Sequence, residues 1–233
     1  MKLATLAELN AERAARRPVI VVTDTANGEQ RLVKAKDFAA DPLRNELAAA
    51  LRMGKSGTIE VSGKKLFLNV YAPTARLVVI GAVHISQALA PIAQSLGYDV
   101  TVVDPRTAFA SPERFPDVPL IAEWPDEALP PLNIDHYTAF VALTHDPKID
   151  DPALLHAFQC DCFYIGALGS RKTHAKRAER LKAQGARDSD IAKIHAPIGL
   201  AIGAVSPSEI AVSIMAEITA QLRLPPKEKE QAA

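Results

Sequence analysis

The chain of 233 residues has little cysteine, no net charge and no long apolar segment. Its two cysteines, Cys160 and Cys162, lie too close in sequence to bridge readily, so a disulfide framework is absent and a reducing compartment is expected. Because 27 basic residues balance 27 acidic ones, no overall field favours nucleic acid or a membrane as partner. No apolar run approaches the roughly 20 residues of a membrane helix, and the first residues lack the pattern of a signal peptide. We therefore expect a cytoplasmic protein.

Several motifs that carry chemistry are missing as well. The six histidines are scattered, and no pair at positions i and i+4 encloses a glutamate, which excludes a zincin-type site. No G-x-x-x-x-G-K-[ST] segment occurs, so the chain is no P-loop enzyme. Cys160 and Cys162 are expected on one face of a strand, without the second pair that completes a zinc site. We predict no metal site, and cysteines that belong to the core or to a sheet edge.

The composition, 48% apolar and 23% charged, is that of a globular protein. Its length allows one large domain, or a small domain and a medium one. Residues 1–72 predict a small α+β module. Its expected elements are a helix from Leu3 onward, a strand over 19–22, a helix over 42–53 that Asp41 caps, and a hairpin over 58–70.

From Arg76, predicted strands alternate with predicted helices, which is typical of a parallel sheet. The apolar run Leu77–Ile80 is expected of a strand covered on both faces. Further strands are predicted over 100–104, 120–121, 139–143 and 163–166, and helices over 84–96, from 151, over 170–184 and over 206–221. We predict an α/β fold whose second domain, 73–224, is a Rossmann-like parallel sheet with helices on both faces. A polar tail, 225–233, follows.

The first candidate binding segment is the turn after the first strand of this domain. A dinucleotide fold places glycines there for a pyrophosphate, and an acid about 20 residues later bonds a ribose hydroxyl. Gly81 and Asp104 match this spacing, but Val83 and Ser86 replace the second and third glycines. We therefore expect a Rossmann fold that does not bind NAD in the ordinary way. Asp104 can equally be a turn residue before Pro105.

The second candidate segment, Thr144, His145 and Asp146, follows an apolar strand. In open α/β sheets the carboxyl ends of strands form the ligand crevice. A His–Asp pair at such a place can bond a ligand, bind a metal or transfer a proton. Alternatively, Asp146 and Pro147 start a turn and His145 faces solvent.

The third candidate segment runs from a strand through Gly166 and Gly169 to Ser170 and Arg171, which open a basic helix. Glycine lets backbone amides converge, and a helix N-terminus with basic side chains favours an anion. Ser170 and Arg171 are therefore predicted ligand contacts.

Charge is unevenly distributed along the chain. The stretch 171–182 holds six basic residues and one acid, whereas 113–161 holds ten acids and two bases. These two stretches can pair with each other or with partners, and most of the basic side chains are expected to be solvated.

The fourth candidate segment is apolar and bends at Pro197 and Gly199, and His195 is its one titratable group. A buried structural histidine is the simpler interpretation of His195.

Six separated segments occur in a fixed order: VVIGAVHISQALA, VVDPR, ALTHD, YIGALGSRKTHAKR, IHAPIGLAIGA and PSEIAVSIMAEI. Together they resemble the XdhC/CoxI family, accessory proteins in the maturation of xanthine dehydrogenase and carbon monoxide dehydrogenase. The resemblance covers residues 66–222. It implies a Rossmann-like domain that binds molybdenum cofactor (molybdopterin) as cargo. The implied function is a chaperone without turnover of its own, which protects the cofactor, supports its sulfuration and inserts it into an apo-molybdoenzyme of the xanthine dehydrogenase type.

The resemblance further implies a cysteine desulfurase as partner and a homo-oligomer such as a dimer. It assigns cofactor-binding roles to residues of five short motifs. These residues are Gly81, Ala82 and His84; Asp104 and Arg106; Thr144, His145 and Asp146; Gly166, Gly169, Ser170 and Arg171; and Pro197 and Gly199.

The first module departs from the family pattern, which carries G-S-x-P-R and G-G-C-V-E segments near the N-terminus. Thr25–Gly28 occupies the corresponding region here, and no cysteine precedes Cys160. The module 1–72 is therefore a degenerate version of the family's first module. Two alternatives to the chaperone stay open: an NAD(P)-dependent oxidoreductase that uses the same crevice, and a non-catalytic interaction paralogue whose crevice is empty.

Overall fold

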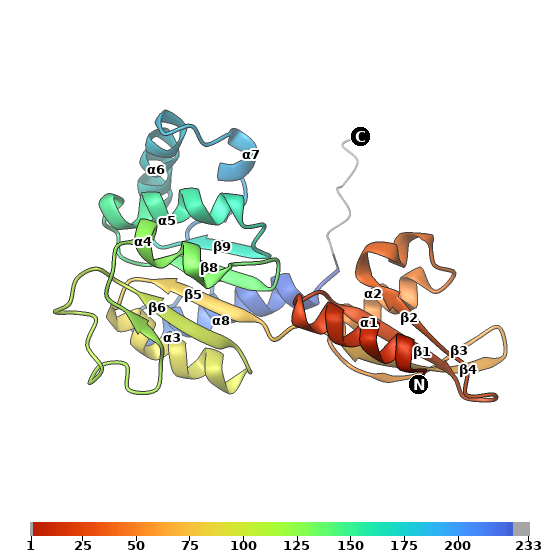
Figure 1. Cartoon of the computed structure of the whole chain (residues 1–233). Coiled ribbons are helices and arrows are strands. Elements are labelled where there is room, and N and C mark those ends of the chain that lie inside the picture. Colours follow the sequence, from red (N-terminus) through yellow and green to blue (C-terminus); the bar gives the residue numbers. More distant parts are fainter. Residues whose placement is uncertain (1, 226–233) are drawn as a thin grey trace, which may run out of the picture. The chain divides into compact units, whose positions relative to one another are not determined.

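The computed structural model describes residues 2–225 (Figure 1). Its contacts divide the chain into two compact units, one up to Pro73 and one over Thr74–Leu222. Of the predicted polar tail, 226–233 lies outside the described residues. Within residues 2–225, no helix combines the length and the apolar character that crossing a membrane requires.

The first unit is a four-stranded antiparallel sheet with the order β2-β1-β4-β3. Its central strand β1 is apolar on both faces because helices cover both faces: Leu9 of α1 packs on one, and Leu47 of α2 packs on the other. The elements are α1 (Leu3–Ala14), β1 (Val19–Asp24), β2 (Gln30–Lys34), a 3-10 helix η1 (Ala35–Ala40), α2 (Arg44–Met53), β3 (Gly57–Val61) and β4 (Lys64–Tyr71).

Two details of the predicted first unit are wrong. Helix α2 begins at Arg44 rather than at 42, because the Asp41 carboxylate accepts a hydrogen bond from Leu43 N (2.9 Å) in a turn that precedes the helix. The sequence places the hairpin turn at residues 62–65, but the turn is shorter, since Lys64 pairs with Val61 and already belongs to β4. Strand β2 was not predicted, because Leu32 and Val33 are its only apolar residues and do not form an alternating pattern.

The second unit is a six-stranded parallel sheet with the order β10-β9-β8-β5-β6-β7, which confirms the predicted Rossmann-like α/β fold. The chain reverses its direction of strand addition between β5 and β8, where such folds open a crevice. The elements are β5 (Arg76–Ile80), α3 (His84–Ser95), β6 (Asp99–Val103), β7 (Leu120–Ile121), α4 (Pro125–Ala128), a 3-10 helix η2 (Pro130–Leu132), β8 (Thr138–Ala142), α5 (Pro147–Gln159), β9 (Tyr164–Ala167), α6 (Arg171–Ala183), α7 (Asp188–Ile191), β10 (Ile194–His195) and α8 (Pro207–Arg223).

Helices cover both faces of this sheet (Figure 1). Successive residues of a strand point to opposite faces, and the core follows this rule. Leu77 and Val79 belong to the apolar cluster with α3 and α8, whereas Val78 and Ile80 belong to the cluster with α5 and α6.

Two boundaries in the second unit follow from specific side chains. Helix α5 begins at Pro147, because the Asp146 carboxylate caps it by accepting a hydrogen bond from Lys148 N (2.9 Å). The predicted start at 151 is wrong, since the second Asp-Pro pair lies inside the helix. The capping box before α8 is confirmed: the Glu209 carboxylate accepts from Ser206 N, and Ser206 Oγ accepts from Glu209 N.

The cysteines do not share a strand as predicted. Cys160 ends α5 and Cys162 lies in the turn before β9, and both are free thiols. Burial raises the pKa of Cys162 to about 12, so its thiol is an inert, partly buried group.

The packing around Gly166 in β9 can be tested directly. A Cβ atom at this position would lie 2.5 Å from Ile198 Cδ1 and 2.8 Å from Tyr164 Cε1. We expect Gly166→Ala to lower the free energy of unfolding by about 1–3 kcal/mol, the usual cost of overpacking, as measured by chemical denaturation. Because Ile198→Ala removes both Cδ1 and Cγ1, which would lie 2.5 and 2.7 Å from the new Cβ atom, the double variant should lose less than the sum of the two single variants. Additive losses from the two substitutions would contradict the packing.

Candidate functional site

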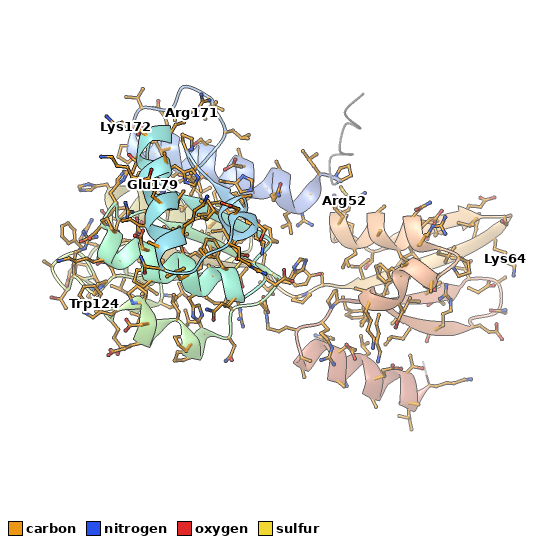
Figure 2. The ribbon with its side chains drawn as sticks, turned by 90° about the horizontal axis from the view of Figure 1, so that it is seen from above. Arg52, Lys64, Trp124, Arg171, Lys172 and Glu179 are labelled. Carbon is orange, nitrogen blue, oxygen red and sulfur yellow. The ribbon has the colours of Figure 1, made fainter. Side chains whose placement is uncertain are left out.

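The predicted site residues gather at the carboxyl edge of the parallel sheet. Gly81 follows β5, Asp104 follows β6, Thr144 follows β8 and Leu168 follows β9. In this fold the loops after the strands form the ligand-binding side. Arg171 and Lys172, which open α6, are labelled on this side of the unit in Figure 2.

The side chain of Asp104 is hydrogen-bonded to other groups of the protein. It is fully buried, accepts a hydrogen bond from Ala82 N (2.7 Å) and forms a two-pronged ion pair with Arg106 (2.9 and 2.7 Å). Burial alone would raise the pKa of Asp104, but the hydrogen bonds from Arg106 and Ala82 outweigh it and hold the pKa below its usual value. In dinucleotide folds the acid at this position bonds a ribose hydroxyl. Here the Asp104 carboxylate instead accepts a hydrogen bond from Ala82 in the turn after β5.

The turn after β5 packs closely against the loop after β8. A Cβ atom on Gly81 would lie 2.7 Å from Thr144 Cγ2, so glycine is needed here for contact with the neighbouring loop. Ser86, at the place of the third glycine, is buried and donates from its hydroxyl to Gly81 O. Val83 is the N-cap residue of α3, and His84 is exposed on the first turn of that helix.

Asp150 of α5 organises the loop after β8. Its buried carboxylate accepts hydrogen bonds from Thr144 Oγ1 (2.7 Å), Thr144 N (3.3 Å) and His145 N (3.1 Å). These bonds hold His145 in the left-handed conformation (φ 64°), with its ring exposed. Thr144 and Asp146 are therefore engaged in shaping the loop, and His145 is the member of this motif whose side chain is free to meet a ligand.

A buried arginine of α6 lies beneath the next loop. Arg177 is 2% exposed, donates from Nη2 to Leu168 O (2.8 Å) and places Nη2 3.8 Å from the Asp150 carboxylate. Its Nε and Nη1 atoms are buried without a partner among the described residues. Burial lowers the pKa of Arg177 and raises that of Asp150. This pair was missed, because six basic residues in one helix indicated a solvated face.

The basic and acidic stretches do pair with each other in part. Besides Arg177 with Asp150, Arg180 forms a two-pronged ion pair with Asp151 of α5 (2.6 and 3.0 Å). Helices α5 and α6 are thereby joined along one flank of the loops.

A cavity of about 540 Å³ opens beside these loops. One wall is the polar turn Gly169–Arg171 with His145, and the opposite wall is the apolar segment Pro197–Ala204. Six of the predicted site residues meet here: His145, Gly169, Ser170, Arg171, Pro197 and Gly199. The other predicted residues lie elsewhere. Gly166 lies in β9 under Ile198, and His84 is exposed on the first turn of α3. The rest lie at the turn after β5, at Asp104 or in the loop after β8.

The polar wall ends in the first turn of α6. Ser170 is the N-cap residue, and its Oγ accepts a hydrogen bond from Thr173 N (3.2 Å). The first amides of a helix have no intrahelical acceptor and carry the positive end of its dipole. Arg171, exposed at this end, adds a full positive charge. The wall is suited to an anionic group.

Glu217 of α8 fixes the apolar wall. Its carboxylate accepts hydrogen bonds from Gly199 N (2.8 Å), Tyr164 Oη (2.5 Å) and His195 Nδ1 (3.1 Å). Burial alone would raise the pKa of Glu217, but the hydrogen bonds from His195, Tyr164 and Gly199 outweigh it and lower the pKa. His195 stacks on the Tyr164 ring (centroids 4.6 Å apart) and is half-buried. Its contacts are those of a structural histidine, which was the simpler of the two interpretations of the sequence. Sequence reasoning missed Glu217, because nothing in its helical context distinguishes it from a surface glutamate.

Within the described part of the chain, no three His, Cys, Asp or Glu side chains cluster in a way that could hold a metal ion.

A parallel sheet in this order, with ligand loops at its carboxyl edge, defines a Rossmann-type binding domain. The family model described as the XdhC Rossmann domain matches residues 77–218. The chain therefore belongs to the XdhC family.

Three relatives in well-studied bacteria are similar to this chain. The uncharacterized protein YqeB of Escherichia coli K12 is 33% identical over 174 residues, which is 72% of this chain and 32% of that protein. A probable xanthine dehydrogenase subunit of Bacillus subtilis 168 is 34% identical over 66% of this chain and 44% of its own length. The molybdenum cofactor insertion chaperone PaoD of E. coli K12 is 32% identical over 66% of this chain and 42% of its own length. The chain thus spans less than half the length of each relative.

The fold also occurs in a crystal structure described as a xanthine dehydrogenase from Bacillus halodurans. The match has a TM-score of 0.66 and 22% identity, and it covers 94% of this chain and 66% of that one. At this identity the likeness supports the fold and no more.

The buried pair beneath the loops gives a stability prediction. Arg177→Met removes the cation and leaves the Asp150 carboxylate buried, so we expect a loss of about 3–5 kcal/mol in the free energy of unfolding. Lys182→Met, which breaks the exposed pair of Lys182 with Asp188, is the matched control and should leave stability nearly unchanged. Equal effects of the two substitutions in urea denaturation would contradict the role of Arg177.

The Glu217 network gives a pH prediction. Because folding lowers the pKa of Glu217, its contribution is complete above the ordinary value of 4.5 and is lost as the pH falls below it. Glu217→Gln should be less stable than the wild type at neutral pH by about 1–3 kcal/mol, and the gap should narrow in acid. Denaturation curves across this pH range measure the gap, with Glu179→Gln as an exposed control. A gap that does not change with pH would reject the charged network.

Proposed function

We propose that this protein is a chaperone that holds molybdenum cofactor in the cavity between α6 and the segment Pro197–Ala204. The observation that carries the proposal is the pairing of an anion-binding turn with an apolar wall in one cavity of about 540 Å³, a size typical of small-molecule sites. Membership of the XdhC family and the names of two relatives, a cofactor insertion chaperone and a xanthine dehydrogenase subunit, support the same cargo.

Each wall suits one end of this cargo. The phosphate of the pterin cofactor would bind at the first turn of α6, where free amides, the helix dipole and Arg171 favour an anion. The flat ring system would pack on the apolar segment that Glu217 holds in place. His145, at the rim beside Gly169, would hydrogen-bond a polar edge of the ring.

The protein carries the cofactor without turning it over. The receiving protein in this proposal is an apo-molybdoenzyme of the xanthine dehydrogenase type. Support for sulfuration of the bound cofactor, with a cysteine desulfurase as partner, and assembly into a homo-oligomer are further parts of the proposal. Because no cysteine precedes Cys160, the sulfur would come from the partner and not from a cysteine of the first unit.

The anion-binding wall is tested by Arg171→Ala. Removing this charge should weaken retention of the cofactor at least about 10-fold, since hydrogen bonds to charged groups contribute about 1.5–3 kcal/mol. The measurement mixes purified protein with molybdenum cofactor released from a donor enzyme and follows co-elution of molybdenum and pterin fluorescence. Lys176→Ala, one turn along the same helix and also exposed, is the matched control. Unchanged retention by Arg171→Ala would reject the site.

A further inference from the structure

Residues 200–204 form a part of the apolar cavity wall that is open to solvent. All five line the cavity, and Figure 2 labels Arg171 at the start of α6, on the facing wall. Leu200 and Ile202 are 43% and 55% exposed. Apolar side chains in this position still contact water, and burying them is favourable. We call residues 200–204 the strap.

Both ends of the strap are held by carboxylates of α8. At one end, Glu217 accepts a hydrogen bond from Gly199 N (2.8 Å). At the other end, Glu209 accepts hydrogen bonds from Val205 N (2.9 Å) and Ser206 N (2.8 Å). A movement of the strap would therefore leave these two points in place.

Between its ends the strap makes few hydrogen bonds. Leu200 N donates to Ser213 O (3.2 Å), and Ile202 N donates to Leu200 O (2.8 Å). Among residues 2–225, the amides of the other three strap residues, Ala201, Gly203 and Ala204, donate no hydrogen bond to a protein group. Segments with few such bonds open at low cost in free energy.

The strap is also longer than the distance that it bridges. Glu209 and Glu217 lie on the same helix, roughly 12 Å apart along its axis at about 1.5 Å per residue. The chain over 199–205 can span roughly 20 Å when it is extended. At Gly203 (φ 77°) a Cβ atom would meet nothing within 4 Å. The middle of the strap therefore has the length and the room to move while its ends stay fixed.

We propose that the strap closes over the bound cargo, and that the cargo leaves only when the strap opens. Closure would bring Ile202 onto the flat ring and remove water from its exposed face. Closing segments of this kind shield a ligand from water and set the rate of its release. The inference rests on the proposed function, and it adds how one site both protects the cofactor and gives it up.

The movement is tested by the distance between two spin labels in the whole chain. The labels are attached at Lys176→Cys on α6 and Ala201→Cys in the strap, both exposed, after Cys160 and Cys162 are replaced by Ala. We expect molybdenum cofactor released from a donor enzyme to shorten this distance by several ångströms. The control pair joins Lys176→Cys to Val212→Cys, which is 50% exposed on α8, and its distance should not change.

Release of the cofactor gives the second measurement. Ile202→Ser should release bound cofactor at least about 10-fold faster than the wild type, because the strap loses its exposed apolar contact. Val212→Ser, which replaces an equally exposed side chain outside the cavity lining, should release it at the wild-type rate.

The outcomes separate the strap from the site. Cofactor that is retained with no change in the distance between positions 176 and 201 would overturn the strap and leave the proposed function standing. Equal release rates for Ile202→Ser and the wild type would also overturn the strap. No retention of cofactor by the unlabelled wild type would reject the proposed function, and the strap with it.

Discussion

The buried pair of Asp150 and Arg177 is the interaction on which the binding edge of this protein depends. Asp150 gathers the amides of the loop after β8, and Arg177 holds Leu168 in the loop after β9. One helix supplies the acid and the next helix supplies the base, so the two loops are fixed with respect to each other. Two charges taken out of water are costly unless well paired, and among residues 2–225 the Nε and Nη1 atoms of Arg177 have no hydrogen-bond partner. The Asp150–Arg177 pair therefore fixes the positions of the loops after β8 and β9.

The cavity that we propose as the binding site lies beside the usual crevice of the fold and not in it. Between β5 and β8, Gly81 lies close to Thr144, and Ala82 N donates a hydrogen bond to the Asp104 carboxylate. Space opens instead beside β9 and β10, where Gly169 leads into α6 and Glu217 holds the facing segment. The family motifs thus divide into a set that shapes the edge and a set that lines the cavity.

The sequence predicts those parts of the structure that depend on local signals. The Rossmann-like order, the helix that starts after Ser170 and the capping box at Ser206 follow from apolar patterns and helix caps, and the structure confirms all three. The burial of Arg177 and the role of Glu217 could not be predicted, because each depends on contacts with residues far away in sequence. The wrong start of α5 has a local cause: two Asp-Pro pairs offer equivalent caps in the sequence, and in the structure Asp146 is the cap while Pro152 lies inside the helix.

Hydrogen exchange with and without the cofactor tests whether molybdenum cofactor binds between the first turn of α6 and Pro197–Ala204, as we propose. Binding at this place should slow amide exchange in two segments, Leu168–Thr173 and Ile198–Ala204, with little change around Gly81 and Asp104. Protection confined to the turn after β5, or no protection in either cavity wall, would contradict it.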